Sequence, residues 1–112
     1  ARRLAREAIQ LNPSVGRAYL FIGTLYQSSV KGNDCGKGEF EKRMIYAAAL
    51  RQARKASSVD PSISSVASSY IKTYRANLPS KKVIFTEGVN EGSPYTIKCW
   101  INETVTITSS GN

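Results

Sequence analysis

The feature that most constrains this chain is a pattern of small, apolar and aromatic residues that occurs twice in its 112 residues. In each copy an alanine lies five positions before a proline: Ala8 before Pro13, and Ala56 before Pro61. Apolar or aromatic residues follow each proline at plus six, plus nine and plus thirteen, and they are Tyr19, Ile22, Tyr26, Ala67, Tyr70 and Tyr74. This spacing predicts helical units that cannot bury an apolar face alone and must stack on neighbours.

Hydrophobic periodicity predicts four helices in the first two thirds of the chain. They span Arg2–Leu11 and, with approximate ends, residues 14–29, 39–58 and 62–77. Gly23 costs about 1 kcal/mol relative to Ala inside a helix, so we expect another helix to cross close to it, where a Cβ would clash. Ala49, Ala53 and Ala56 form a ridge of small residues that allows close helix packing.

After Pro79 the apolar pattern changes to alternation, which is typical of strands. Residues 83–85, 95–101 and 104–108 are rich in β-branched and aromatic side chains. We expect two or three short strands, with a hairpin turn at Asn102-Glu103. An isolated hairpin is marginal in water. Its apolar side is therefore expected to pack on the last helices, through Ile97, Cys99 or Trp100, Val105 and Ile107.

The repeated pattern resembles the tetratricopeptide repeat, a helix-turn-helix unit of about 34 residues. The matching positions are Tyr19, Ile22, Gly23 and Tyr26 in its first helix, and Ala49, Ala53, Ala56 and Pro61 in its second. The two prolines are 48 positions apart, so about 14 additional residues lie within the unit. A Gly-rich insertion accounts for part of this excess.

Three further segments extend the resemblance: the insertion that contains Cys35, residues 40–43, and the string Cys-Trp-Ile-Asn-Glu-Thr at residues 99–104. Together they are similar to a group of bacterial tetratricopeptide proteins of unassigned function. The resemblance implies a mainly α fold, a TPR-like antiparallel helix-pair solenoid with a capping helix and a small C-terminal β-hairpin.

The resemblance also implies a division of the chain. The helical region is 1–79, made of the end of a preceding repeat (1–12), one repeat (14–61) with an insertion at 30–38, and a capping helix (62–78), and the hairpin tail is 80–112. The chain enters the pattern midway, so we expect a C-terminal part of a longer repeat protein. Self-association through the exposed first helix is an open alternative.

The chain contains two cysteines, Cys35 and Cys99, 64 positions apart. They form no Cys-x-x-Cys motif, and two sulfurs without histidine make a poor zinc site. They are either ordinary thiols or a bridge between the insertion and the hairpin. The family resemblance, with a Cys in both segments, favours the bridge. A bridge would favour a periplasmic or other extracytoplasmic bacterial location.

Composition gives little support for catalysis. There is no histidine, which removes the commonest general base and metal ligand. We therefore expect no enzyme activity and no cofactor. The formal charge is +8, from 16 Lys and Arg against 8 Asp and Glu, but the cations are spread along the chain. We interpret them as solvated helix faces and do not expect nucleic acid as the partner.

The resemblance implies a concave surface lined by the first helix of each unit. Carried over by offset, its residues are Arg17, Leu20, Thr24, Gln27, Ser65, Ser68, Lys72 and Arg75. Three cations make this groove mildly basic, which suits an acidic peptide segment or a C-terminal carboxylate. The alternative is that these are ordinary surface residues.

We therefore expect a non-catalytic protein- or peptide-binding scaffold. Two other hypotheses stay open: a basic module that contacts nucleic acid or anionic surfaces, and a purely structural cap of a solenoid. No apolar run approaches the ~20 residues of a membrane span.

Overall fold

The computed structural model describes residues 1–32 and 35–111 of the chain. Within them the fold is mainly helical, with one short 3₁₀ turn and a two-stranded antiparallel sheet. The elements are α1 (Arg2–Leu11), α2 (Gly16–Lys31), α3 (Gly38–Val59), η1 (Pro61–Ile63), α4 (Ser64–Ala76), α5 (Lys81–Glu87), β1 (Pro94–Ile97) and β2 (Glu103–Thr106). The predicted insertion at 30–38 includes residues 33 and 34, which lie outside the described residues.

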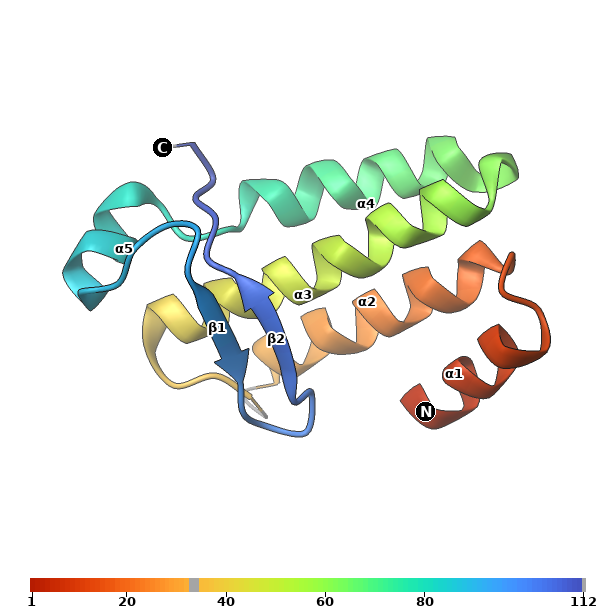
Figure 1. Ribbon diagram of the computed structural model, residues 1–112, viewed down its shortest axis with the longest axis horizontal. Coiled ribbons are helices and arrows are strands. Elements are labelled where there is room, and N and C mark those ends of the chain that lie inside the picture. The colour runs from red at the N-terminus through yellow and green to blue at the C-terminus, as the bar shows by residue number, and fades with distance from the viewer. Residues whose placement is uncertain (33–34, 112) are drawn as a thin grey trace.

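The first four α-helices lie side by side in chain order and alternate in direction (Figure 1). Helix α3 is central, since it packs against α2, α4, α5 and both strands. The hairpin lies across α3, while the short helix α5 lies at the end of the molecule where α3 begins (Figure 1). The predicted mainly helical fold with a small hairpin is therefore confirmed.

Small side chains let these helices approach one another. Ala49, Ala53 and Ala56 on α3 and Ala67 on α4 are fully buried. Larger buried side chains of α2, α3 and α4, among them Tyr26, fill the core around these alanines. The ridge of alanines predicted from the sequence therefore lies in the core.

Of the two glycines inside α2, Gly16 and not Gly23 is the one where an added Cβ would clash. A Cβ on Gly16 would lie 2.6 Å from Ile63 Cδ1 and 2.7 Å from Asp60 Cβ. At Gly23 the nearest atoms, the Ala49 carbonyl oxygen and Tyr74 Oη, would be 3.4 Å away, which is ordinary contact. The expectation that a Cβ would clash at Gly23 is wrong.

Asp60 explains why Gly16 is so close to the end of α3. The Gly16 N–H donates to Asp60 Oδ2 at 3.2 Å, and the Ser62 N–H donates to Asp60 Oδ1 at the same distance. The carboxylate thus caps the start of α2 and of η1 together. The hydrogen bond from the Ser62 hydroxyl is the main cause that lowers the pKa of Asp60. One side chain therefore joins two turns that are 44 residues apart.

The strand predicted at residues 83–85 is wrong, because this segment belongs to helix α5. The Val83 N–H donates to Ser80 Oγ at 3.1 Å, so Ser80 caps the helix start. Gly88 ends the helix in the left-handed conformation with φ of 79°. The predicted hairpin tail, 80–112, therefore begins with a helix.

The hairpin turn lies earlier than predicted. Strands β1 and β2 pair antiparallel with Pro94 opposite Thr106 and Ile97 opposite Glu103. Glu103 is thus a strand residue, and the turn spans residues 98–102, where Asn102 has a φ of 45°. The expected apolar side is confirmed at Ile97 and Val105 in the strands and at Ile107 directly after β2, because all three are buried.

A disulfide bond joins Cys35, just before α3, to Cys99 in the hairpin turn. The pairing that the family resemblance favoured is therefore present. A second attachment lies near the start of α3, where Tyr95 donates its hydroxyl to Glu41 Oε2 at 2.7 Å and packs edge-on against Phe40. The hairpin is thus held covalently and by packing at the same end of the molecule.

Reducing the disulfide should lower the free energy of unfolding by about 4 kcal/mol, because the bond closes a loop of 64 positions in the unfolded chain. Chemical denaturation with and without dithiothreitol measures the difference. The Cys35→Ser, Cys99→Ser double variant is the control and should not respond to dithiothreitol. A count of two free thiols in unreduced protein would contradict the bond.

Gly16→Ala should destabilise the fold by about 1–3 kcal/mol, since the new Cβ meets Ile63, Asp60 and the Ala56 carbonyl. Gly23→Ala should stay within about 1 kcal/mol of the parent, because ordinary contacts and better helix propensity act there. Urea denaturation followed by circular dichroism compares the two variants. Equal losses would show that the contact at Gly16 relaxes freely.

Candidate functional site

The eight predicted groove residues do not all lie on one surface. On α2, Arg17 is exposed, Thr24 and Gln27 are half-buried, and Leu20 is buried in the core with 6% exposure. On α4 the remaining four residues are exposed, and they are Ser65, Ser68, Lys72 and Arg75. Leu20 therefore lies beneath the surface, while the other seven are at least partly accessible.

Four of the predicted groove residues line one of two separate hollows. Gln27 joins four α4 residues around a cavity of about 160 Å³ between α2 and α4. These partners are Ser69, Tyr70, Thr73 and Tyr74. We call this the α2–α4 cavity. The offsets taken from the repeat family did not select Ser69 or Thr73, because they select a different face of α4.

The other three residues lie on a separate face of α4. Ser68, Lys72 and Arg75 line a shallow hollow of about 440 Å³, which Ser110 also lines. Both cations are exposed. The structure thus brings together Ser68, Lys72 and Arg75, but it places them apart from Gln27.

Tyr74 is the most unusual residue of the α2–α4 cavity. Its side chain is buried, and its hydroxyl has no hydrogen-bond partner among the described residues. Burial, with smaller effects from Tyr70 and Tyr46, raises the pKa of Tyr74 to about 12. A buried hydroxyl without a partner costs about 1–3 kcal/mol. The hydroxyl is therefore a neutral donor that a ligand acceptor would satisfy.

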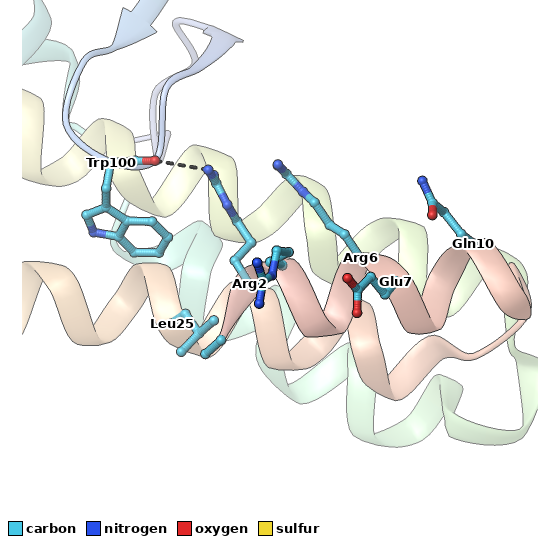
Figure 2. A pocket seen from close by; sticks show the side chains of 8 residues that line it. Arg2, Arg6, Glu7, Gln10, Leu25 and Trp100 are labelled. Carbon is cyan, nitrogen blue, oxygen red and sulfur yellow. Dashed lines mark hydrogen bonds between the residues drawn. The ribbon is translucent and has the colours of Figure 1, made fainter.

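A larger cavity, of about 590 Å³, lies between α1 and the hairpin turn. Its lining includes Arg2, Arg3, Arg6, Glu7, Leu25 and Trp100. Figure 2 shows Arg2, Arg6 and Gln10 along one side of α1, with Trp100 of the hairpin facing Arg2. We call this the α1–hairpin cavity.

Arg2 attaches α1 to the hairpin turn. Its Nη1 donates to the Ile101 carbonyl at 2.6 Å, and its Nη2 donates to the Trp100 carbonyl at 3.0 Å. The guanidinium carbon also lies 5.1 Å from the centre of the Trp100 ring, within range of a cation–π contact. The indole N–H donates to Ser29 Oγ of α2 at 2.8 Å. These contacts fix the wall of the α1–hairpin cavity.

Behind this wall, Glu103 is almost fully buried, and its carboxylate contacts polar side chains from three helices. It accepts hydrogen bonds from the Tyr26 hydroxyl and from Arg51, and its Oε2 lies 3.6 Å from Arg6 Nη2. Arg51 also donates to the Thr104 carbonyl at 2.9 Å. Burial and the bond to Glu103 raise the pKa of Tyr26, while Arg2 opposes this effect. The carboxylate therefore joins the hairpin to α1, α2 and α3.

The sequence patterns indicated none of these residues as functional. Arg2, Arg6 and Arg51 were interpreted as solvated cations, and Glu103 as part of a turn. Within the described residues, no three His, Cys, Asp or Glu side chains gather in a way that could hold a metal ion. Over the same ranges, no helix is both long and apolar enough to cross a membrane.

Comparison of the chain with models of protein families, with curated proteins and with solved structures gives no match. The description of both cavities therefore rests on their own geometry.

Tyr26→Phe should destabilise the protein by about 2 kcal/mol, because the buried Glu103 loses a hydrogen-bond donor. Tyr74→Phe should instead stabilise the protein, by up to about 1–3 kcal/mol, because it removes a buried hydroxyl that has no partner within the described chain. Both changes remove one oxygen from a buried tyrosine, so each is the control for the other. Urea denaturation measures them, and an equal loss in Tyr74→Phe would show that its hydroxyl is bonded in solution.

Proposed function

We propose that this chain is part of a TPR-like helical scaffold that binds an extended peptide segment on the surface of α2 and α4. Support comes from four antiparallel helices that pack in chain order through a ridge of alanines. In such stacks each unit contacts mainly its neighbours, which leaves long surfaces open for partners. The scaffold proposal also agrees with the tetratricopeptide resemblance of residues 14–61.

The observation that carries the proposal is the hydroxyl of Tyr74, a residue that lines the α2–α4 cavity and whose hydroxyl lies against Gly23 of α2. It is buried and has no partner within the described residues. A backbone carbonyl of a bound peptide would accept its proton and remove the cost of the unmade hydrogen bond. Tyr74 is only 1% exposed, so the proposal requires side chains that line the cavity, such as the half-buried Gln27, to move aside as the peptide enters.

The surroundings favour a peptide over a small metabolite. The cavity of about 160 Å³ is small for a drug-sized ligand, which typically needs about 300 Å³ or more. Its lining combines two aromatic rings, those of Tyr70 and Tyr74, with the polar side chains Gln27, Ser69 and Thr73. Such a mixture suits the backbone groups and one small side chain of a bound peptide. Lys72 and Arg75, on the neighbouring face of α4, favour acidic residues in the flanking part of the peptide.

The same proposal includes an oxidising compartment. The bond between Cys35 and Cys99 closes a long loop, and structural disulfides persist mainly outside the reducing cytosol. We therefore place the scaffold at an extracytoplasmic location in this proposal.

A random heptapeptide library displayed on phage and selected on the immobilised protein tests the proposal. Synthetic copies of the selected peptides should bind Tyr74→Phe about fivefold more weakly, the equivalent of one lost hydrogen bond of about 1 kcal/mol. Ser69→Trp should abolish binding by filling the cavity, since Ser69 is exposed on its rim. Isothermal titration calorimetry supplies the dissociation constants.

Controls separate this site from general electrostatics. Lys55→Glu changes an exposed cation on α3 and should leave peptide binding within about twofold. The Lys72→Glu, Arg75→Glu double variant should weaken only those selected peptides that carry acidic residues. If Ser69→Trp and Tyr74→Phe both bind the peptides as the parent does, the α2–α4 surface is not the binding site.

A further inference from the structure

The α1–hairpin cavity has a surplus of positive charge that its own residues do not neutralise. The groups in and directly behind its wall are Arg2, Arg3, Arg6, Arg51, Glu7 and Glu103. Four guanidinium groups therefore face two carboxylates. Arginine stays protonated at any physiological pH, so the surplus is permanent and attracts an anionic group.

The individual arginines differ in how much of their donor capacity is used. Arg2 donates to two backbone carbonyls and to the Tyr26 hydroxyl, so it is a structural group. Arg6 has one ion pair, at 3.6 Å, to the carboxylate of Glu103, which already accepts hydrogen bonds from Tyr26 and Arg51. Its side chain is half-exposed.

Arg3 is exposed, and no hydrogen bond or ion pair engages it within the described part of the chain. A guanidinium group can bind a carboxylate through two parallel hydrogen bonds. Arg3 and Arg6 are therefore the two side chains of the cavity that are able to take a new anionic partner.

The cavity also has an apolar part. Trp100 is 42% exposed, and Leu25 of α2 lies beside it in the lining. A ligand that carries an apolar group next to its charge would bury that group against these side chains.

We propose that the α1–hairpin cavity binds an acidic peptide segment of a partner protein. Two of its carboxylates pair with Arg3 and Arg6, and an intervening apolar side chain packs on Trp100 and Leu25. This site is distinct from the α2–α4 cavity, and its occupation does not depend on the function proposed for that surface.

The lining disfavours the other anionic partners. A nucleic acid needs cations that follow a phosphate backbone, whereas Glu7 interrupts the arginines of this cavity. A second copy of this chain carries +8 and would be repelled. The volume of about 590 Å³ fits a ligand of a few side chains.

Trp100 is the only tryptophan of the chain, so its fluorescence reports on this cavity without a label. The probe is an acetylated, amidated peptide of two glutamates, one leucine and two glutamates. Its titration into the intact, oxidised protein at 150 mM salt should give a saturable change in Trp100 emission. Arg3→Glu should weaken binding about fivefold or more, which is the loss expected for reversing one exposed ion pair.

Matched variants make the outcome specific. Lys55→Glu changes the net charge equally but is not among the residues that line this cavity, so it should alter affinity less than about twofold. The Lys72→Glu, Arg75→Glu variant, which alters the face beside the α2–α4 cavity, should leave the Trp100 signal of this peptide unchanged. Failure of this site is therefore distinguishable from failure of the α2–α4 site.

Three results would overturn the proposal. The first is no saturable change of Trp100 emission at millimolar peptide. The second is an equal loss of affinity in Arg3→Glu and Lys55→Glu, which would reduce binding to net charge. The third is tighter binding of a twelve-residue oligothymidylate than of the peptide, with a steep dependence on salt, which would assign the cavity to nucleic acid.

Discussion

The buried carboxylate of Glu103 is the interaction on which the arrangement of the hairpin and the helices depends. A carboxylate taken out of water without partners costs several kcal/mol, so its position is tolerated only where donors meet it. Here Tyr26 comes from α2, Arg51 from α3 and Arg6 from α1. A displacement of any of these helices would leave the charge with fewer partners. A single side chain on β2 therefore fixes the hairpin against three helices, although two strands alone would be marginal.

The hairpin turn is held from two sides, and this geometry creates the α1–hairpin cavity. Cys99 is bonded to Cys35 near the start of α3, and the adjacent Trp100 is held by Arg2 of α1 and by Ser29 of α2. The indole therefore reaches across from the sheet to the first two helices and is left partly exposed. Because Cys99 and Trp100 are neighbours, the covalent bond restricts how far the cavity wall can move. Stability and the shape of the candidate site thus depend on the same turn.

The sequence predicted a helix correctly where two or more local signals agreed on it. The bounds of α1, Arg2–Leu11, follow from periodicity and from Pro13, which disfavours a helix at the residue before it. Residues 83–85 were misassigned because Val-Ile-Phe is typical of strands, yet so short a run has no distinguishable period. The capping residues Ser80 and Gly88 were the better signal. The close contact of Gly16 could not be predicted, since Asp60 and Ile63 lie more than forty positions away.

The spacing of residues in the sequence indicates part of the lining of the α2–α4 cavity, but it indicates nothing of the α1–hairpin cavity. Repeat offsets selected Gln27, which lines the α2–α4 cavity, because Tyr26 and Gly23 fix the rotation of α2 in the core. On α4 the offsets selected one face, but Tyr70 and Tyr74 pack toward α2 and α3 and bring their own side of the helix to the cavity. The α1–hairpin cavity had no such signal, because Arg2 and the backbone it binds are 98 and 99 positions apart. The offsets of the repeated pattern thus indicated one residue of the α2–α4 cavity, whereas a cavity between a helix and an appended hairpin requires the tertiary contacts.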